Sequence, residues 1–135
     1  MTLSNPRPPP GAGSSDLKDL RILLVEDSWP IGIALKRLLR AMGADVVGPV
    51  ATASEAERLA SEHTPDVALV DFNLRGGERA NGLIDRLHDQ SVRVVVISGY
   101  RDLPLAPGKV AAILQKPVRQ EQLLAALRPV TNAAP

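Results

Sequence analysis

Short apolar segments alternate with amphipathic segments along most of this 135-residue chain, and this alternation limits the possible folds more than any other feature. Each apolar segment has the length of a strand, and its nearly unbroken hydrophobicity is typical of a strand that is buried on both faces. The expected strands are, in chain order, residues 21–25, 44–50, 66–72, 92–98 and 110–115.

Helices are expected between and after these strands, because apolar residues recur there at helical spacing. The first expected helix begins after Ser28, which can cap it, and ends at Gly43. Pro30 is tolerated because it lies in the first turn. The other expected helices span residues 54–63, around 83–88, and 119–128. Strands that alternate with helices through short connections form right-handed crossovers. The sequence therefore predicts a doubly wound α/β fold, with a parallel sheet that is covered on both faces.

The size of the chain fits one domain with a proper core. We expect a flexible tail rich in Pro, Gly and Ser at residues 1–18, the domain at 19–128, and a C-terminal tail at 129–135. No stretch has the apolar core of a secretory signal or the length of a membrane span. The expected location is the cytoplasm, with no membrane partner.

Composition excludes some classes of function. The chain has no cysteine, which excludes disulfides, thiolate catalysis and zinc sites with cysteine ligands. Its formal net charge of +1 gives no electrostatic basis for binding nucleic acid, so no nucleic-acid partner is expected.

Polar residues stand at the carboxyl ends of the expected strands. Glu26 and Asp27 follow the first strand, Asp71 lies near the end of the third, Ser98 ends the fourth, and Lys116 follows the fifth. Ligands of doubly wound folds bind at this edge of the sheet, so we expect these side chains to converge. Carboxylates packed together repel one another and take up protons unless a cation keeps them ionised. Mg²⁺ suits such a site, because it prefers oxygen ligands and often joins carboxylates to a phosphate oxygen.

This group of side chains is suited to phosphoryl transfer. Asp71 could attack a phosphoryl donor and form an aspartyl phosphate, while Lys116 and the Ser98 hydroxyl stabilise charge on the transferring oxygens. Taken singly, each residue also has a structural explanation: adjacent carboxylates such as Glu26 and Asp27 stabilise the start of a helix, and a lysine at a strand end is an ordinary surface residue. Their shared sheet edge favours the functional interpretation.

The segments LLVEDS, ALVDFNL, VVVISGY and LQKPV, in this order, resemble the receiver domains of bacterial two-component response regulators. The resemblance covers about residues 19–128 and implies a flavodoxin-like five-stranded sheet with the strand order 2-1-3-4-5. It implies that Asp71 accepts a phosphoryl group from a histidine kinase or phosphotransfer protein. It also implies that Mg²⁺ is held at Asp71 by Asp27 and by the main-chain carbonyl of Asn73, with Glu26 assisting, often through water.

The same resemblance assigns roles to the remaining polar residues. Lys116 would pair with the phosphoryl group, and its bond to Pro117 would be cis. Ser98 would move to bond a phosphoryl oxygen and so report the modification.

The sequence departs from the usual receiver pattern at the expected output surface. Ile113 stands where receivers usually have an aromatic residue, three positions before the conserved lysine. The span from Ser98 to Lys116 is short and broken by prolines, so its helix, the fourth of the family's fold, should be short or broken. The run VISGY is similar to the Phe-Ala-Thr-Gly-hydrophobic-Tyr (FAT-GUY) subgroup of stand-alone receivers. In that case Tyr100 either replaces the missing aromatic residue or only packs.

The leading hypothesis is a single-domain response regulator that signals by phosphorylation-dependent protein binding or by phosphorelay, since too few residues remain for an output domain. Such a protein catalyses only its own Mg²⁺-dependent phosphorylation and dephosphorylation, so we do not expect an enzyme. The alternatives are a phosphate sink that drains a kinase and a constitutive docking module with a vestigial pocket. A phosphohydrolase is disfavoured, because the second carboxylate usual in those enzymes is replaced by Asn73.

Overall fold

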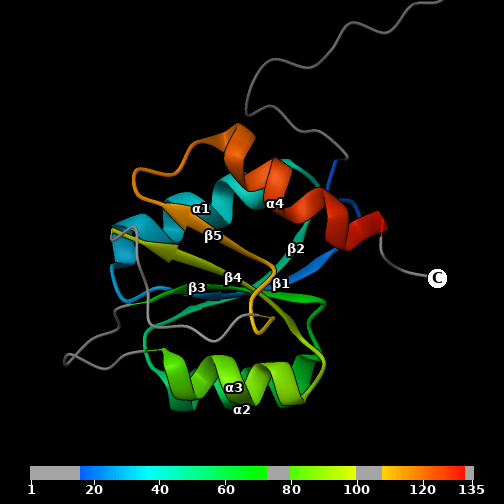
Figure 1. Cartoon of the computed structure of the whole chain (residues 1–135). Coiled ribbons are helices and arrows are strands. Elements are labelled where there is room, and N and C mark those ends of the chain that lie inside the picture. Colours follow the sequence, from blue (N-terminus) through cyan, green and yellow to red (C-terminus); the bar gives the residue numbers. More distant parts are fainter. Residues whose placement is uncertain (1–15, 73–79, 100–107, 133–135) are drawn as a thin grey trace, which may run out of the picture.

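Strands and helices alternate along the chain as the sequence predicts. The computed structural model describes residues 16–72, 80–99 and 108–132 (Figure 1). The strands are β1 (Arg21–Val25), β2 (Asp45–Val50), β3 (Val67–Asp71), β4 (Arg93–Ser98) and β5 (Ala112–Gln115). The helices are α1 (Trp29–Ala41), α2 (Ala53–His63), α3 (Asn81–Asp89) and α4 (Gln120–Asn132). Each expected strand and helix is confirmed, with differences of a few residues at the ends.

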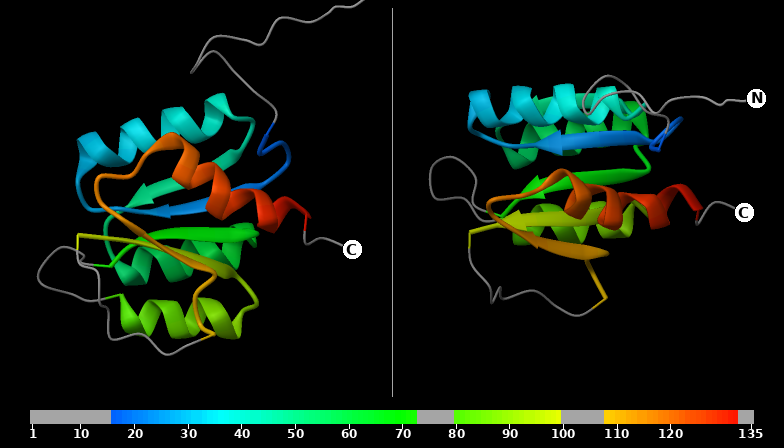
Figure 2. Two further views of the ribbon diagram at one scale, coloured as in Figure 1. Left: turned by 45° about the horizontal axis from the view of Figure 1, so that its top comes forward. Right: turned by 90° about the horizontal axis from the view of Figure 1, so that it is seen from above.

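The strands form one parallel sheet in the order β2-β1-β3-β4-β5, which confirms the predicted doubly wound fold and its strand order. Helices α1 and α4 cover one face of the sheet, and α2 and α3 cover the other (Figures 1 and 2). The chain order of the strands reverses between β1 and β3. The carboxyl ends of these two strands therefore form the switch point at which ligands of such folds bind.

Each face of the sheet has its own hydrophobic core, and successive strand residues alternate between the two. In β1, Leu23 and Val25 pack toward α2 and α3, whereas Ile22 and Leu24 pack toward α1 and α4. This alternation follows from the pleat of the strand, which turns neighbouring side chains to opposite faces. Because helices cover both faces, both sets are apolar, which explains the unbroken hydrophobic runs in the sequence.

Buried core residues occur on both sides of the expected limits of 19 and 128. Leu17 is fully buried in the core beneath α1 and α4, and its N–H donates to the carbonyl of Met42 at 2.9 Å. At the other end, α4 continues through Pro129 to Asn132. A proline inside a helix removes one hydrogen bond, but the burial of Val130 in the same core stabilises this last turn.

Two expectations fall outside the described residues. The short or broken helix expected after the fourth strand falls mainly on residues 100–107, and the N-terminal tail falls mainly on residues 1–15. Among the helices that the structure describes, none combines the length and the hydrophobicity that a membrane span requires.

The burial of Leu17 gives a direct test of where the folded domain begins. We expect Leu17→Ala to lower the free energy of unfolding by about 2–5 kcal/mol, because it removes a fully buried side chain and leaves a cavity. The neighbouring exposed Lys18 provides the control, and Lys18→Ala should change stability by no more than about 0.5 kcal/mol. Urea unfolding measures both. Equal midpoints for the two variants would show that the domain begins after this segment.

Candidate functional site

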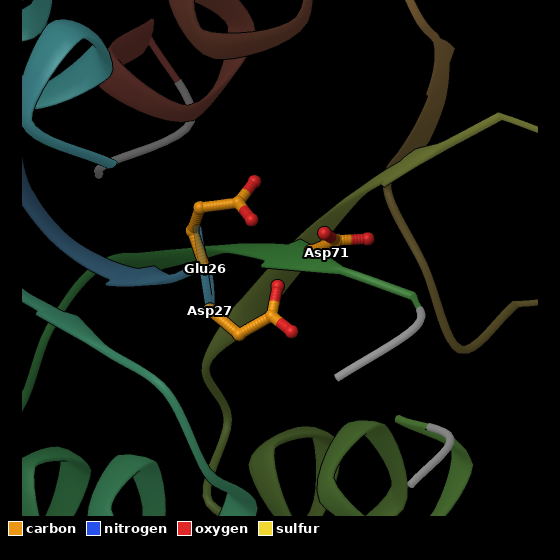
Figure 3. Close-up of side chains that lie close together, drawn as sticks. All are labelled: Glu26, Asp27 and Asp71. Atoms are coloured by element: carbon orange, nitrogen blue, oxygen red, sulfur yellow. The ribbon is translucent and has the colours of Figure 1, made fainter. Parts of the chain in front are cut away.

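Three carboxylates meet at the switch point between β1 and β3. Glu26 directly follows β1, and its N–H donates to the Val50 carbonyl at the end of β2 with a distance of 2.9 Å. Asp71 is the last residue of β3, the strand that pairs with β1. Each of Glu26, Asp27 and Asp71 contributes one carboxylate oxygen to a group in which all three lie within 4.8 Å of one another. Figure 3 shows Glu26 on the side of α1 and Asp27 on the opposite side.

Two of the three carboxylates are shielded from solvent, which makes their negative charges costly. Glu26 is only 4% exposed and Asp71 only 5%, while Asp27 is half-buried. Burial, together with the nearby charge of Asp71, raises the pKa of Glu26 from 4.5 to about 7. The hydrogen bond from the Ser28 N–H to the Glu26 carboxylate, at 3.0 Å, opposes the increase.

That hydrogen bond corrects the role expected of Ser28. Ser28 does occupy the N-cap position of α1, but its side chain makes no capping hydrogen bond. Its main-chain N–H instead binds the Glu26 carboxylate, and its carbonyl accepts the N–H of Gly32 at 2.8 Å. Ser28 therefore links the first turn of the helix to the acidic cluster.

Lys116 lies in direct contact with Asp71. Its Nζ donates to Oδ2 of Asp71 at 3.2 Å. The ladder between β4 and β5 fixes this position, because Ser98 pairs with Gln115 and the Lys116 N–H donates to the Ser98 carbonyl at 2.8 Å. The bond between Lys116 and Pro117 is cis, as the resemblance implied.

Ser98 is fully buried at the end of β4, beside the end of β3. The structure thus brings together Glu26, Asp27, Asp71 and Lys116, and it places Ser98 on the adjoining strand end. Asn73, the expected main-chain ligand, and Tyr100 lie outside the described residues.

The chemistry of this site suits a divalent cation such as Mg²⁺. Its donors are carboxylate oxygens, which hard cations prefer. Two of the three carboxylates are almost fully buried, and burial favours the protonated form of Glu26. A bound cation would reverse that preference by stabilising all three ionised groups.

An apolar groove of about 600 Å³ adjoins the carboxylates, between α1 and the connection from β5 to α4. Glu26 and Lys116 belong to its lining. Its apolar lining comprises Ile31, Ala34, Leu35, Leu38, Ile97, Pro117 and Val118. The sequence did not reveal this groove, because the α1 residues that line it share one apolar stripe with those of the core. Ile31, near the start of the helix, is 46% exposed, and the preceding Trp29 is 66% exposed.

Comparisons with known proteins agree with this fold. Residues 22–128 match the response regulator receiver domain, and the chain therefore belongs to that family. A search of curated proteins gave no match.

Several solved receiver structures share the fold. The signal receiver domain of a modulated diguanylate cyclase from Desulfovibrio desulfuricans G20 is 26% identical, with a TM-score of 0.72, over 86% of this chain and 100% of that one. A Burkholderia pseudomallei response regulator with a phosphorylated aspartic acid and a calcium ion is 27% identical, with a TM-score of 0.72, over 85% of this chain and 72% of that one. SdrG from Sphingomonas melonis Fr1 is 28% identical, with a TM-score of 0.70, over 83% of this chain and 96% of that one.

The raised pKa of Glu26 predicts how the stability of the metal-free protein depends on pH. The pKa in the folded state is about 7, above the ordinary value of 4.5, so the folded state binds this proton more tightly. The resulting stabilisation is fully present below pH 4.5 and is lost as the pH rises through 7. It should amount to at most about 3 kcal/mol, because one pKa unit corresponds to about 1.4 kcal/mol.

Urea unfolding at several pH values, with a chelator present, measures this effect. Glu26→Gln removes the titrating group and keeps a similar shape, so the stability difference between wild type and this variant should change between pH 4.5 and pH 8. Added Mg²⁺ should oppose the effect in the wild type, because it competes with the proton. A difference that stays constant with pH would contradict the assigned cause.

Proposed function

We propose that this chain is a single-domain response regulator that accepts a phosphoryl group on Asp71 from the phosphohistidine of a histidine kinase or phosphotransfer protein. The observation that carries the proposal is the position of Asp71: it is buried at the switch point, within a cluster of carboxylates, and 3.2 Å from the Lys116 ammonium. Membership of the receiver family supports the same chemistry.

In the proposed reaction, a carboxylate oxygen of Asp71 attacks the phosphorus atom of the donor. A bond forms between this oxygen and phosphorus, and the bond from phosphorus to the imidazole nitrogen breaks. The electron pair of the broken bond stays on that nitrogen, which then takes up a proton. A cation held by Glu26, Asp27 and Asp71 would supply charge neutralisation for the phosphoryl oxygens.

The protein's own cationic and hydroxyl groups complete the site. Lys116 contacts Asp71, so its positive charge lies beside the position that the transferring group would occupy. The buried Ser98 supplies the hydroxyl that would bond a phosphoryl oxygen after transfer. The similar Burkholderia pseudomallei structure holds a phosphorylated aspartic acid together with a calcium ion, which supports this combination of groups.

The apolar groove is the proposed docking surface for the protein that donates the phosphoryl group. A donor protein that brings its phosphohistidine to Asp71 must cover residues beside the site, and the groove lining includes both Glu26 and Lys116. Trp29 and Ile31 expose large apolar surfaces at the start of α1. Tryptophan often contributes strongly to binding at interfaces.

The finer assignments are part of the same proposal. Phosphorylation would change the binding of a downstream protein or pass the phosphoryl group onward, with catalysis limited to the chain's own modification. The FAT-GUY subgroup is supported by Ser98, Gly99 and Tyr100 and by the absence of an aromatic residue at Ile113, which is 43% exposed. A cytoplasmic location fits a phosphoryl acceptor for kinases. A phosphate sink differs in one outcome, since its phosphoryl group would return to the kinase without a change in partner binding.

Phosphorylation by a small acyl phosphate tests the central chemistry without a partner protein. With Mg²⁺ present, the wild type should gain the mass of one phosphoryl group, and a chelator should prevent this gain. Asp71→Asn should gain nothing, because an amide is not a nucleophile for this reaction. The exposed Asp89 gives the matched control, and Asp89→Asn should react like the wild type. Phosphorylation of Asp71→Asn to the wild-type level would refute the proposed acceptor.

The docking surface is tested by comparing two kinds of donor. Ile31→Ser should weaken transfer from a phosphorylated histidine protein by roughly tenfold, because it removes apolar contact area from the groove. The same variant should react normally with the small acyl phosphate, which needs no docking surface. Arg37→Ser is the control on the same helix, since Arg37 is exposed and does not line the groove. Equal losses with both donors would place the defect in the chemical site instead.

A further inference from the structure

Helix α1 and the end of β2 approach each other closely at Gly32. A Cβ atom at position 32 would lie 2.9 Å from both Cβ and Cγ of Pro49, and 3.7 Å from Cγ of Glu26. The first two distances are shorter than real contacts between carbon atoms, and the proline ring is too rigid to move aside alone. Only glycine therefore allows the first turn of α1 to lie this close to β2.

The glycine at position 32 is unfavourable for the stability of the helix itself. Inside a helix, glycine is less favourable than alanine by about 1 kcal/mol. Gly82, in the first turn of α3, provides a contrast. A Cβ atom there would meet only the end of the flexible Arg86 side chain, at 3.4 Å. Close packing thus gives Gly32 a specific role that Gly82 lacks.

The contact between Gly32 and Pro49 is connected to the acidic cluster by two short routes. On the helix side, the Gly32 N–H donates to the Ser28 carbonyl at 2.8 Å, and the Ser28 N–H donates to the Glu26 carboxylate at 3.0 Å. On the strand side, Val50 follows Pro49, and its carbonyl accepts the Glu26 N–H at 2.9 Å. Both the carboxylate and the main chain of Glu26 therefore depend on how α1 sits against β2.

We propose that Gly32 and Pro49 are positioning residues for the cation site. Their contact holds the first turn of α1 against β2 and so keeps the Glu26 carboxylate beside Asp27 and Asp71. This inference rests on the proposed function, because it assumes that the cluster binds Mg²⁺. Neither residue touches the cation or the phosphoryl group; both act through Glu26.

The test is the Mg²⁺ affinity of Gly32→Ala, measured by calorimetry and by the rate of phosphorylation from an acyl phosphate at increasing Mg²⁺. The added methyl group should push the first turn away from Pro49 and raise the Mg²⁺ dissociation constant about tenfold, as the loss of supporting contacts around metal ligands commonly does. The phosphorylation rate at saturating Mg²⁺ should change little, because Asp71 and Lys116 keep their places. Gly82→Ala is the matched control and should leave the affinity unchanged.

A double variant separates positioning from a general loss of stability. Pro49→Gly removes the ring that the new methyl group would meet, so Gly32→Ala should have little further effect on affinity in that background. The proposal is overturned by a folded Gly32→Ala protein with wild-type affinity, or by an equal effect of Gly32→Ala in both backgrounds. If Gly32→Ala does not fold, the Mg²⁺ affinity of Pro49→Gly alone tests the proposal. A Pro49→Gly protein with wild-type Mg²⁺ affinity would then overturn it. Wild-type protein that binds no Mg²⁺ would overturn the proposed function as well.

Discussion

The structure depends on how negative charge is held at the ends of two buried strands. Because β1 and β3 are covered on both faces, their carboxyl ends place Glu26 and Asp71 where little water can reach them. The resulting desolvation favours a proton on Glu26, and the Lys116 ammonium donates a hydrogen bond to Asp71 at 3.2 Å. The same arrangement that makes three neighbouring carboxylates costly also suits the cluster to holding a cation.

A groove beside the acidic cluster is the proposed surface for recognising a partner protein. The groove between α1 and the connection from β5 to α4 has Glu26 and Lys116 in its lining, so a protein bound there would lie beside the proposed acceptor. The close approach of Gly32 to Pro49 lies next to the Glu26 side chain. We therefore propose two tasks for helix α1: its first turn positions a carboxylate, and its exposed apolar side chains offer a surface for the phosphoryl donor.

Much of the fold could be predicted from the sequence, because its signals are local. Unbroken apolar runs predicted each strand, and the residues at the strand ends predicted the site, including Asp71 and Lys116. What could not be predicted depends on contacts between distant segments. Leu17 and Val130 are buried only because two segments far apart in the sequence pack into the same core. The groove and the contact of Gly32 with Pro49 depend on how closely α1 packs, which periodicity does not reveal. The roles of Asn73 and Tyr100 stay predictions.

The central claim is that one particular carboxylate forms the acyl phosphate, and chemical mapping of that carboxylate tests it most directly. Borohydride reduces an aspartyl phosphate to homoserine and leaves free carboxylates unchanged. After phosphorylation in Mg²⁺ and reduction, peptide sequencing by mass spectrometry should find homoserine in place of Asp71. Glu26 and Asp27 each have a carboxylate oxygen within 4.8 Å of one on Asp71, and they serve as internal controls that should remain unmodified. Reduction at either of these residues, with Asp71 intact, would contradict the account.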